Sequence, residues 1–122
     1  MQTAGFGKII NVSSGVFMAG LAGAGAYAAS KGAVIGLSRV LAREWGANNI
    51  QVNVITPGVI KTEGVVKSGL GEDFFNMFIA QQAVPRVGVP EDLAGTALLL
   101  ASKESDFISG QIFNIDGGFI MH

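Results

Sequence analysis

The chain has 122 residues, a formal net charge of −1, 49% apolar and 14% charged residues, and no cysteine. This length fits one domain, but the charged fraction lies below the about 25% of typical soluble domains, so we expect other protein to cover part of the surface. Without a basic run, a cysteine or an apolar stretch near the roughly 20 residues that span a bilayer, the sequence argues against nucleic-acid binding, disulfides and membrane insertion. It favours a cytoplasmic protein.

The first half of the chain predicts a strand, a glycine-rich connection and a helix. Residues 7–14 (GKIINVSS) are rich in Ile and Val and predict a buried strand. Residues 15–26 hold too much glycine for long regular structure. Residues 27–45 lack proline and carry apolar residues at helical spacing, which predicts a helix that ends in the Gly and Asn residues of 46–49.

The second half repeats this alternation. Residues 50–58 (IQVNVITPG) predict a second strand, and residues 59–88 an irregular stretch with a short helix at 72–82. Residues 90–102 begin with proline followed by acids and predict a helix, and residues 110–116 predict a third strand. The order predicts an α/β fold with a parallel sheet and right-handed crossovers.

Three segments at strand ends would meet at one rim of such a sheet, where ligands usually bind. They are Ser13-Ser14, Pro57-Gly58 and Asp116-Gly117. The helix between the first two strands would start at the same rim, with Tyr27 and Lys31 one turn apart. A lysine ammonium and a helix N-terminus both favour the phenolate form of a tyrosine, which suits proton transfer to or from an alcohol or carbonyl oxygen.

Each feature has a simpler interpretation when it stands alone. A Tyr-x-x-x-Lys pair is most often an interfacial tyrosine and a solvated lysine, two serines often end a strand, and Pro-Gly usually marks a turn. The pattern GAGAYA (23–28) matches a dinucleotide fingerprint in letters only, because no strand directly precedes it. No metal site is expected, since the single histidine is His122.

Taken together, the motifs resemble the short-chain dehydrogenase/reductase family, including its 3-oxoacyl-acyl-carrier-protein reductase-like and alcohol dehydrogenase-like members. The matching segments are NVSS (11–14), YAASK (27–31), VNVITPGVIKT (52–62), AVPRVGVPEDLAGTALLLAS (83–102) and SGQIFNIDGG (109–118). The resemblance implies that residues 1–122 form a single partial Rossmann-like domain. This would be the C-terminal, catalytic half of a doubly wound sheet, with three strands and crossover helices and without the N-terminal nucleotide-binding half.

The resemblance also implies the site residues. Tyr27 would be the catalytic acid/base, Lys31 would favour its phenolate form and bind the nicotinamide ribose, and Ser14 would contact the substrate oxygen. Pro57, Gly58, Ile60 and Thr62 would line the nicotinamide end of NAD or NADP, together with Tyr27 and Lys31. Phe17 would contact substrate with Ser14 and Tyr27, in a pocket made mainly apolar by Met18, Leu21 and residues 64–78.

Two functions follow from this resemblance. The first is an NAD(P)-dependent oxidoreductase that interconverts a secondary alcohol and a ketone, with Tyr27 as the acid/base. The second is a non-catalytic fragment or interaction module that does not bind cofactor on its own. In either case we expect a homo-oligomer, or association with a chain that supplies the nucleotide-binding half.

Overall fold

The structure, a computed structural model, describes residues 1–121 and contains one three-stranded parallel sheet. The strands are β1 (Gly7–Val12), β2 (Ile50–Pro57) and β3 (Ile112–Ile115), in the spatial order β1-β2-β3. Lys8 of β1 lies opposite Gln51 of β2, and Ile55 of β2 lies opposite Phe113 of β3. The predicted α/β fold with parallel strands is confirmed.

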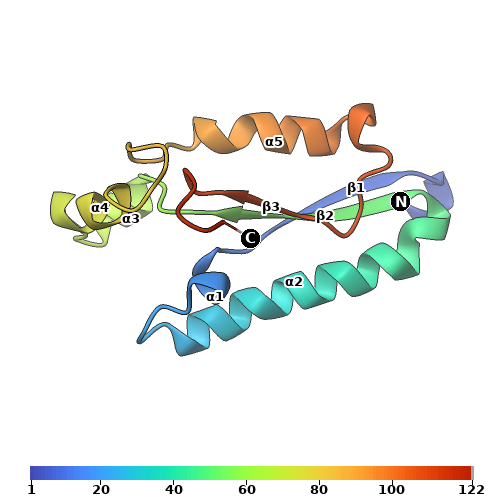
Figure 1. Ribbon diagram of the computed structural model, residues 1–122. Coiled ribbons are helices and arrows are strands. Elements are labelled where there is room, and N and C mark those ends of the chain that lie inside the picture. The colour runs from blue at the N-terminus through green and yellow to red at the C-terminus, as the bar shows by residue number, and fades with distance from the viewer. Residues whose placement is uncertain (122) are drawn as a thin grey trace.

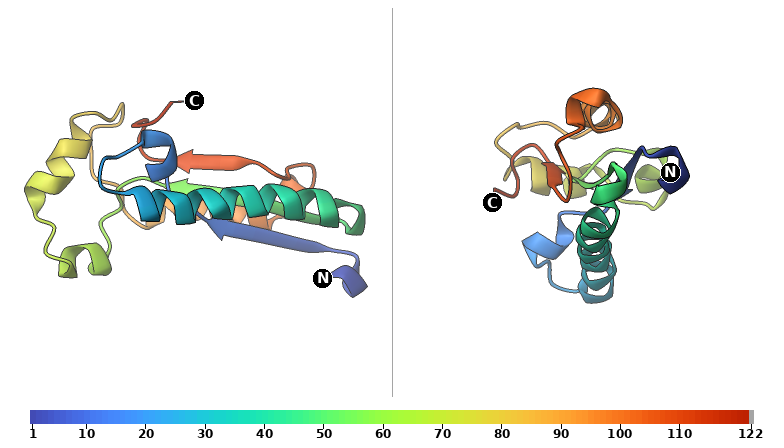
Figure 2. Two further views of the ribbon diagram at one scale, coloured as in Figure 1. Left: turned by 90° about the horizontal axis from the view of Figure 1, so that it is seen from below. Right: turned by 90° about the vertical axis from the view of Figure 1, so that its right-hand side faces the viewer.

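Two long helices sandwich the sheet. Helix α2 (Gly25–Trp45) runs along one face and α5 (Glu91–Ala101) covers the other, so the molecule has three layers (Figures 1 and 2). Strand β2 lies in the centre, and seven of its eight residues are buried. The buried apolar side chains are Val16, Ile35, Ile50, Val52, Val54, Ile55, Phe75, Phe78 and Leu100.

Several short helices occupy the connections. Helix α1 (Val16–Ala19) follows β1, and α3 (Glu63–Lys67) and α4 (Glu72–Ile79) follow β2. Single 3₁₀ turns occur at η1 (Gln2–Ala4), η2 (Gly46–Asn48) and η3 (Lys103–Ser105). The sequence predicted α4, but it did not predict α1 or α3, because four or five residues are too few to establish a helical period.

The prediction of right-handed crossovers is wrong for one of the two connections. Both connections move one strand along the sheet in the same direction, yet α2 and α5 lie on opposite faces (Figures 1 and 2). The β1–α2–β2 crossover is therefore right-handed and the β2–α5–β3 crossover left-handed. The right-handed preference applies when a strand feeds directly into its helix. Residues 58–90 separate β2 from α5, so this constraint is relaxed.

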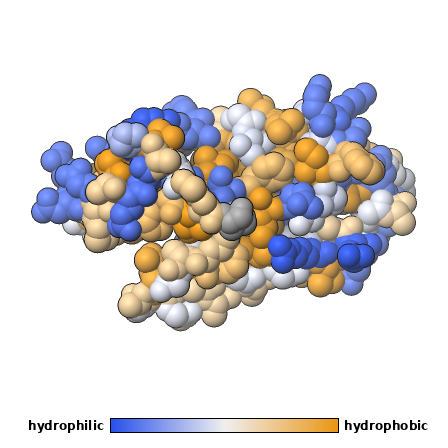
Figure 3. Space-filling model, in the orientation of Figure 1, coloured by the Kyte–Doolittle hydropathy of each residue, from blue (hydrophilic) through white to orange (hydrophobic). Residues whose placement is uncertain are grey.

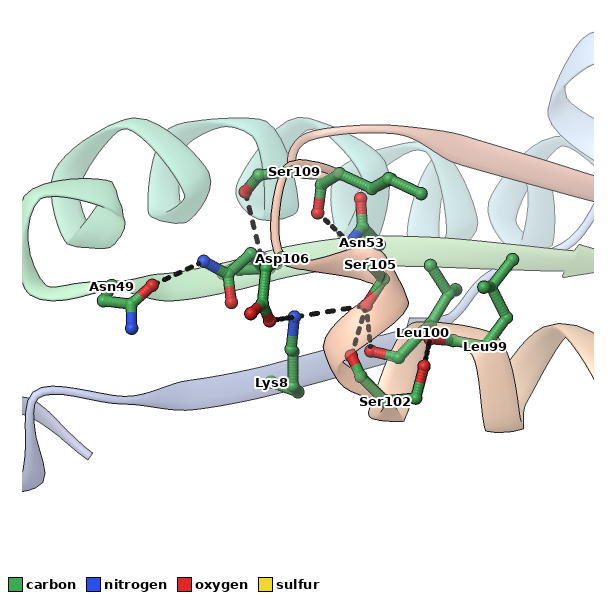
Figure 4. A network of polar contacts seen from close by, with 12 residues as sticks. Lys8, Asn49, Asn53, Leu99, Leu100, Ser102, Ser105, Asp106 and Ser109 are labelled. Carbon is green, nitrogen blue, oxygen red and sulfur yellow. Dashed lines mark hydrogen bonds and ion pairs between the residues drawn. The ribbon is translucent and has the colours of Figure 1, made fainter.

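A polar network fastens the end of α5 to β1 at the edge of the sheet where the strands begin (Figure 4). The buried Lys8 Nζ donates to Asp106 Oδ1 at 2.7 Å and to Ser105 Oγ at 3.2 Å. Ser105 Oγ in turn donates to the Leu100 carbonyl at 3.0 Å. Such satisfied networks fix the position of one element on another.

The start of α5 is held by a bidentate ion pair. Arg86 donates to both carboxylate oxygens of Asp92 at 2.7 and 2.6 Å, and the Val89 amide donates to Asp92 Oδ2 at 2.8 Å. The hydrogen bond from Arg86, followed by that from Val89, lowers the pKa of Asp92 to about 2. Asp92 therefore stays ionised at neutral pH, and its carboxylate ties the first turn of α5 to the preceding loop.

Within residues 1–121, no helix is both long and apolar enough to cross a membrane. The same residues hold no cluster of three or more His, Cys, Asp or Glu side chains with the geometry of a metal site.

Candidate active site

A cavity of about 620 Å³ lies at the carboxyl ends of the strands. It is bounded by α1 and the start of α2 on one side and by α3, α4 and the loop after β3 on the other. In Figure 3 the surface around this recess, at the lower left, is mostly apolar in colour. The volume falls within the about 300–1,000 Å³ of typical ligand pockets.

The two serines after β1 differ in their surroundings. Ser13 is 3% exposed, and its Oγ donates to the Lys31 carbonyl at 2.7 Å, which ties β1 to α2. Ser14 lines the cavity, and its Oγ accepts a hydrogen bond from the Val16 amide at 3.3 Å. Successive residues of an extended segment point to opposite sides, so only Ser14 is available to a ligand.

Tyr27 and Lys31 lie on successive turns of α2. Tyr27 lines the cavity and is 51% exposed. Lys31 Nζ lies 5.8 Å from the centre of the Tyr27 ring and donates to the Val12 carbonyl at 3.3 Å. Lys31 itself does not line the cavity, so the structure sets it beside Tyr27 rather than inside the pocket. Helix α2 begins at Gly25, two residues before the predicted start, and this places Tyr27 in its first turn.

The segment after β2 forms another wall, which includes Pro57, Gly58, Ile60 and Thr62. A Cβ at Gly58 would lie 2.5 Å from Asp116 Cβ, so only glycine allows the ends of β2 and β3 to approach this closely. Thr62 Oγ1 accepts from the Val65 amide at 3.2 Å and caps α3. The glycine and the threonine thus have structural roles beside any ligand contact.

The loop after β3 is organised by one carboxylate. Asp116 Oδ1 accepts from the amides of Gly118 and Phe119 at 2.9 and 3.2 Å. Its Oδ2 accepts from the Ile120 amide at 2.8 Å and from Asn114 Nδ2 at 2.7 Å. These four bonds bring Phe119 and Ile120 to the cavity wall.

Three aromatic rings form part of the wall. The Phe78 ring packs edge-on against Phe74 and Phe119, with centroids 5.1 and 5.4 Å apart. The sequence predicted that residues 64–78, which include Phe74 and Phe78, help to make the pocket apolar, and it did not single out Phe119 or Ile120. The signal available was the apolar pair that directly follows the turn at 116–118.

The sequence predicted that Phe17 contacts the substrate, but the structure does not place Phe17 at the cavity. The adjacent Val16 lines the cavity and is buried, whereas Phe17 and Met18 do not line it. The segment forms the short helix α1, in which neighbouring side chains diverge by about 100°. Leu21, beyond this helix, does line the cavity as expected.

Known proteins match this chain along most of its length. Residues 1–120 match the family described as "Enoyl-(Acyl carrier protein) reductase". The 3-oxoacyl-[acyl-carrier-protein] reductase FabG of Chlamydia muridarum is 43% identical over 112 residues, which cover 92% of this chain and 44% of the relative. The 2-dehydro-3-deoxy-D-gluconate 5-dehydrogenase of Dickeya dadantii is 39% identical over 114 residues, covering 93% and 45%. The chain thus spans about half the length of the curated relatives it matches.

Solved structures agree with this. A short-chain type dehydrogenase/reductase from Mycobacterium ulcerans superposes with a TM-score of 0.91 at 34% identity, covering 98% of this chain and 43% of the other. A blue fluorescent protein from a metagenomic library, in complex with NADPH, gives a TM-score of 0.84 at 37% identity, covering 96% and 46%. The family match, the relatives and the fold together show that this chain belongs to the short-chain dehydrogenase/reductase family.

Proposed function

We propose that the chain carries the catalytic site of an NAD(P)-dependent oxidoreductase that interconverts a secondary alcohol and a ketone. The observation that carries this proposal is the meeting of Ser14 and Tyr27 at one cavity, with Lys31 beside the tyrosine ring. The curated relatives, named as a reductase and a dehydrogenase, support oxidoreductase chemistry.

The residues fit the nicotinamide end of such a cofactor. Lys31 Nζ donates one of its three N–H groups to the Val12 carbonyl, so two N–H groups remain for ribose hydroxyls. Pro57, Gly58, Ile60 and Thr62 supply a mainly apolar surface for the nicotinamide ring. The NADPH complex of the metagenomic protein, which shares the fold, supports this assignment. Residues 23–28 enter α2 from α1 and not from a strand, so they do not form a pyrophosphate-binding turn.

When bound, the nicotinamide supplies or accepts the hydride at the substrate carbon. Tyr27 Oη gives a proton to the substrate oxygen during ketone reduction and removes it during alcohol oxidation. Ser14 Oγ, which accepts from the Val16 amide, keeps its own proton to donate to the same oxygen. The Lys31 ammonium, 5.8 Å from the centre of the Tyr27 ring, places a positive charge beside the proposed site of proton transfer.

Replacing Ser14 and Ser13 separately tests this assignment. Ser14→Ala is expected to lower kcat by about 10²-fold or more, as for the loss of one donor to a reacting oxygen, with little change in stability. Ser13→Ala is expected to act mainly on stability, by about 0.5–1.5 kcal/mol, because it removes the buried hydrogen bond to the Lys31 carbonyl. The measurements are NADPH oxidation by a preparation that reduces a ketone, and urea unfolding of both variants. A larger loss of kcat in Ser13→Ala would mean that the wrong serine was chosen.

A second candidate function is an interaction module, and the exposed surface of the structure favours it. Within residues 1–121, β1 lies at the edge of the sheet and pairs only with β2. Val12 of β1 and Leu37 and Val40 of α2 are exposed apolar residues. A free strand edge beside apolar surface binds other chains readily.

We therefore expect the isolated chain to self-associate, or to bind a chain that supplies the nucleotide-binding half, and to have negligible cofactor affinity alone. Sedimentation equilibrium at micromolar concentration and an NADH fluorescence titration measure the two properties. A stable monomer that binds NADH tightly would contradict this prediction. An assembly that binds NADPH but never oxidises it in the presence of ketones would favour the interaction module over the enzyme.

A further inference from the structure

The charge of the cavity wall is the feature that goes beyond the proposed reaction. Within residues 1–121, no lysine, arginine or histidine lines the cavity. The one carboxylate there, Asp116, accepts four hydrogen bonds from its own loop and strand. These hydrogen bonds hold the loop in place and already stabilise the negative charge of the carboxylate.

The cations closest in sequence to the lining residues do not themselves line the cavity. Arg86 forms its bidentate pair with Asp92. Lys61 Nζ lies 6.0 Å from the centre of the Phe75 ring, and Lys31 Nζ donates to the Val12 carbonyl. A substrate carboxylate in the cavity would lose its water without gaining an ionic partner, and such burial is unfavourable.

The wall away from Tyr27 is apolar. It includes Leu93 of α5, Phe74 and Phe78 of α4, and Phe119 and Ile120 of the loop after β3, while Leu21 adds an apolar side chain between α1 and α2. The edge-on contacts of Phe78 with Phe74 and Phe119 make this wall a packed surface. Ser14 and Tyr27, which both carry hydroxyls, line the same cavity on the side of α1 and α2. The arrangement matches one polar oxygen joined to a hydrocarbon group.

We propose that the substrate is an uncharged ketone or alcohol with an apolar hydrocarbon group, and that the cavity excludes sugar acids and other carboxylates. This inference rests on the proposed oxidoreductase function and names its substrate class. It sets the chain apart from the Dickeya dadantii relative, whose name specifies a gluconate derivative.

A homologous series of ketones tests the apolar wall by binding alone. Methyl ethyl, methyl butyl and methyl hexyl ketone are titrated into the chain, and binding is followed by NMR shifts of the cavity methyl groups. Affinity is expected to rise about fourfold for each added methylene until the cavity is filled, since each buried methylene contributes about 0.8 kcal/mol. The keto acid with a carboxylate in place of the terminal methyl of methyl hexyl ketone is expected to bind at least about tenfold more weakly.

A matched pair of variants locates the selectivity. Leu21→Arg introduces a cation at the cavity mouth, where the leucine is 42% exposed, and is expected to raise the affinity for the keto acid by about threefold to tenfold. Leu98→Arg makes the same change on α5, away from the cavity and at a residue 72% exposed, and is expected to leave both affinities unchanged.

The results separate the cavity from the reaction. The inference would be overturned if affinity stayed the same along the ketone series. It would also be overturned if the keto acid bound the unmodified chain as tightly as methyl hexyl ketone. The same holds if both arginine variants raise keto-acid affinity equally. Ketone binding that follows the series without any NADPH oxidation in the assembled protein would refute the proposed reaction but uphold the selectivity of the cavity. Faster NADPH oxidation with the keto acid than with the ketone would uphold the reaction and refute the selectivity.

Discussion

Tyr27→Phe is expected to reduce ketone reduction by about 10²–10⁴-fold while leaving the fold intact, because it removes the proposed proton donor and nothing else. The Tyr27 side chain is half exposed at the cavity, and the ring that packs there is retained in phenylalanine. Loss of the hydroxyl is therefore not expected to change the free energy of unfolding by more than about 0.5 kcal/mol. NADPH oxidation at saturating ketone and urea unfolding measure the two effects.

Ser30→Ala is a suitable control for this experiment. Ser30 lies on the same helical turn, and its Oγ donates to the Tyr27 carbonyl at 2.7 Å, so the variant also removes one hydroxyl from this part of α2. Its activity is expected to stay within about twofold of the unmodified chain, since the hydroxyl bonds only to the helix itself. If Tyr27→Phe kept most of its activity, proton transfer would have to be assigned to another group.

The elements with a clear sequence pattern were predicted correctly. Strand β2 is rich in Ile and Val because both of its faces are covered, and α5 begins after a proline with two acids in its first turn. The short helices α1 and α3 and the left-handed crossover were not predicted. Helix α1 depends on how the chain between β1 and α2 packs, whereas α3 and the left-handed crossover depend on how the chain between β2 and α5 packs. No local periodicity in the sequence indicates either arrangement.

The candidate site likewise contains features that the sequence predicted and features that it did not. The pairing of Ser14 with Tyr27 at one cavity was expected from strand ends that share a rim, and the structure brings these residues together there. Which side chain of α1 faces the cavity could not be derived, since Val16 and Phe17 are both apolar and only the packed helix separates them. The sequence also did not predict that Asp116 organises the loop after β3. An Asp-Gly-Gly sequence indicates a turn, but it does not indicate which side chains that turn brings to a cavity.

Asp116→Ala is expected to be the most destabilising single change in the loop after β3, lowering the free energy of unfolding by about 2–4 kcal/mol. Asp116 is 7% exposed, and its removal leaves the Gly118 and Ile120 amides without their acceptor. The Phe119 amide keeps only its 3.4 Å bond to the carbonyl of residue 116, and Asn114 Nδ2 keeps only its bond to the Ile120 carbonyl. Because Asn114 Oδ1 also accepts from Thr56 Oγ1 at 2.9 Å, the disturbance reaches a buried side chain at the carboxyl end of β2. The midpoint of urea unfolding at constant m value measures the loss.

Two further variants separate the carboxylate's bonds from a general effect of losing an acid. Asp116→Asn keeps the volume but turns one acceptor oxygen into a donor that faces other donors, so its stability is expected to lie between those of the alanine variant and the unmodified chain. Asp73→Ala removes an exposed acid from the first turn of α4 and is expected to cost no more than about 1 kcal/mol. Hydrogen exchange at the Gly118, Phe119 and Ile120 amides is expected to accelerate in both Asp116 variants. It is expected to stay unchanged at all three amides in Asp73→Ala. Unchanged exchange at these three amides in Asp116→Ala would show that the loop, and with it the Phe119 wall of the cavity, is held by packing and not by the carboxylate.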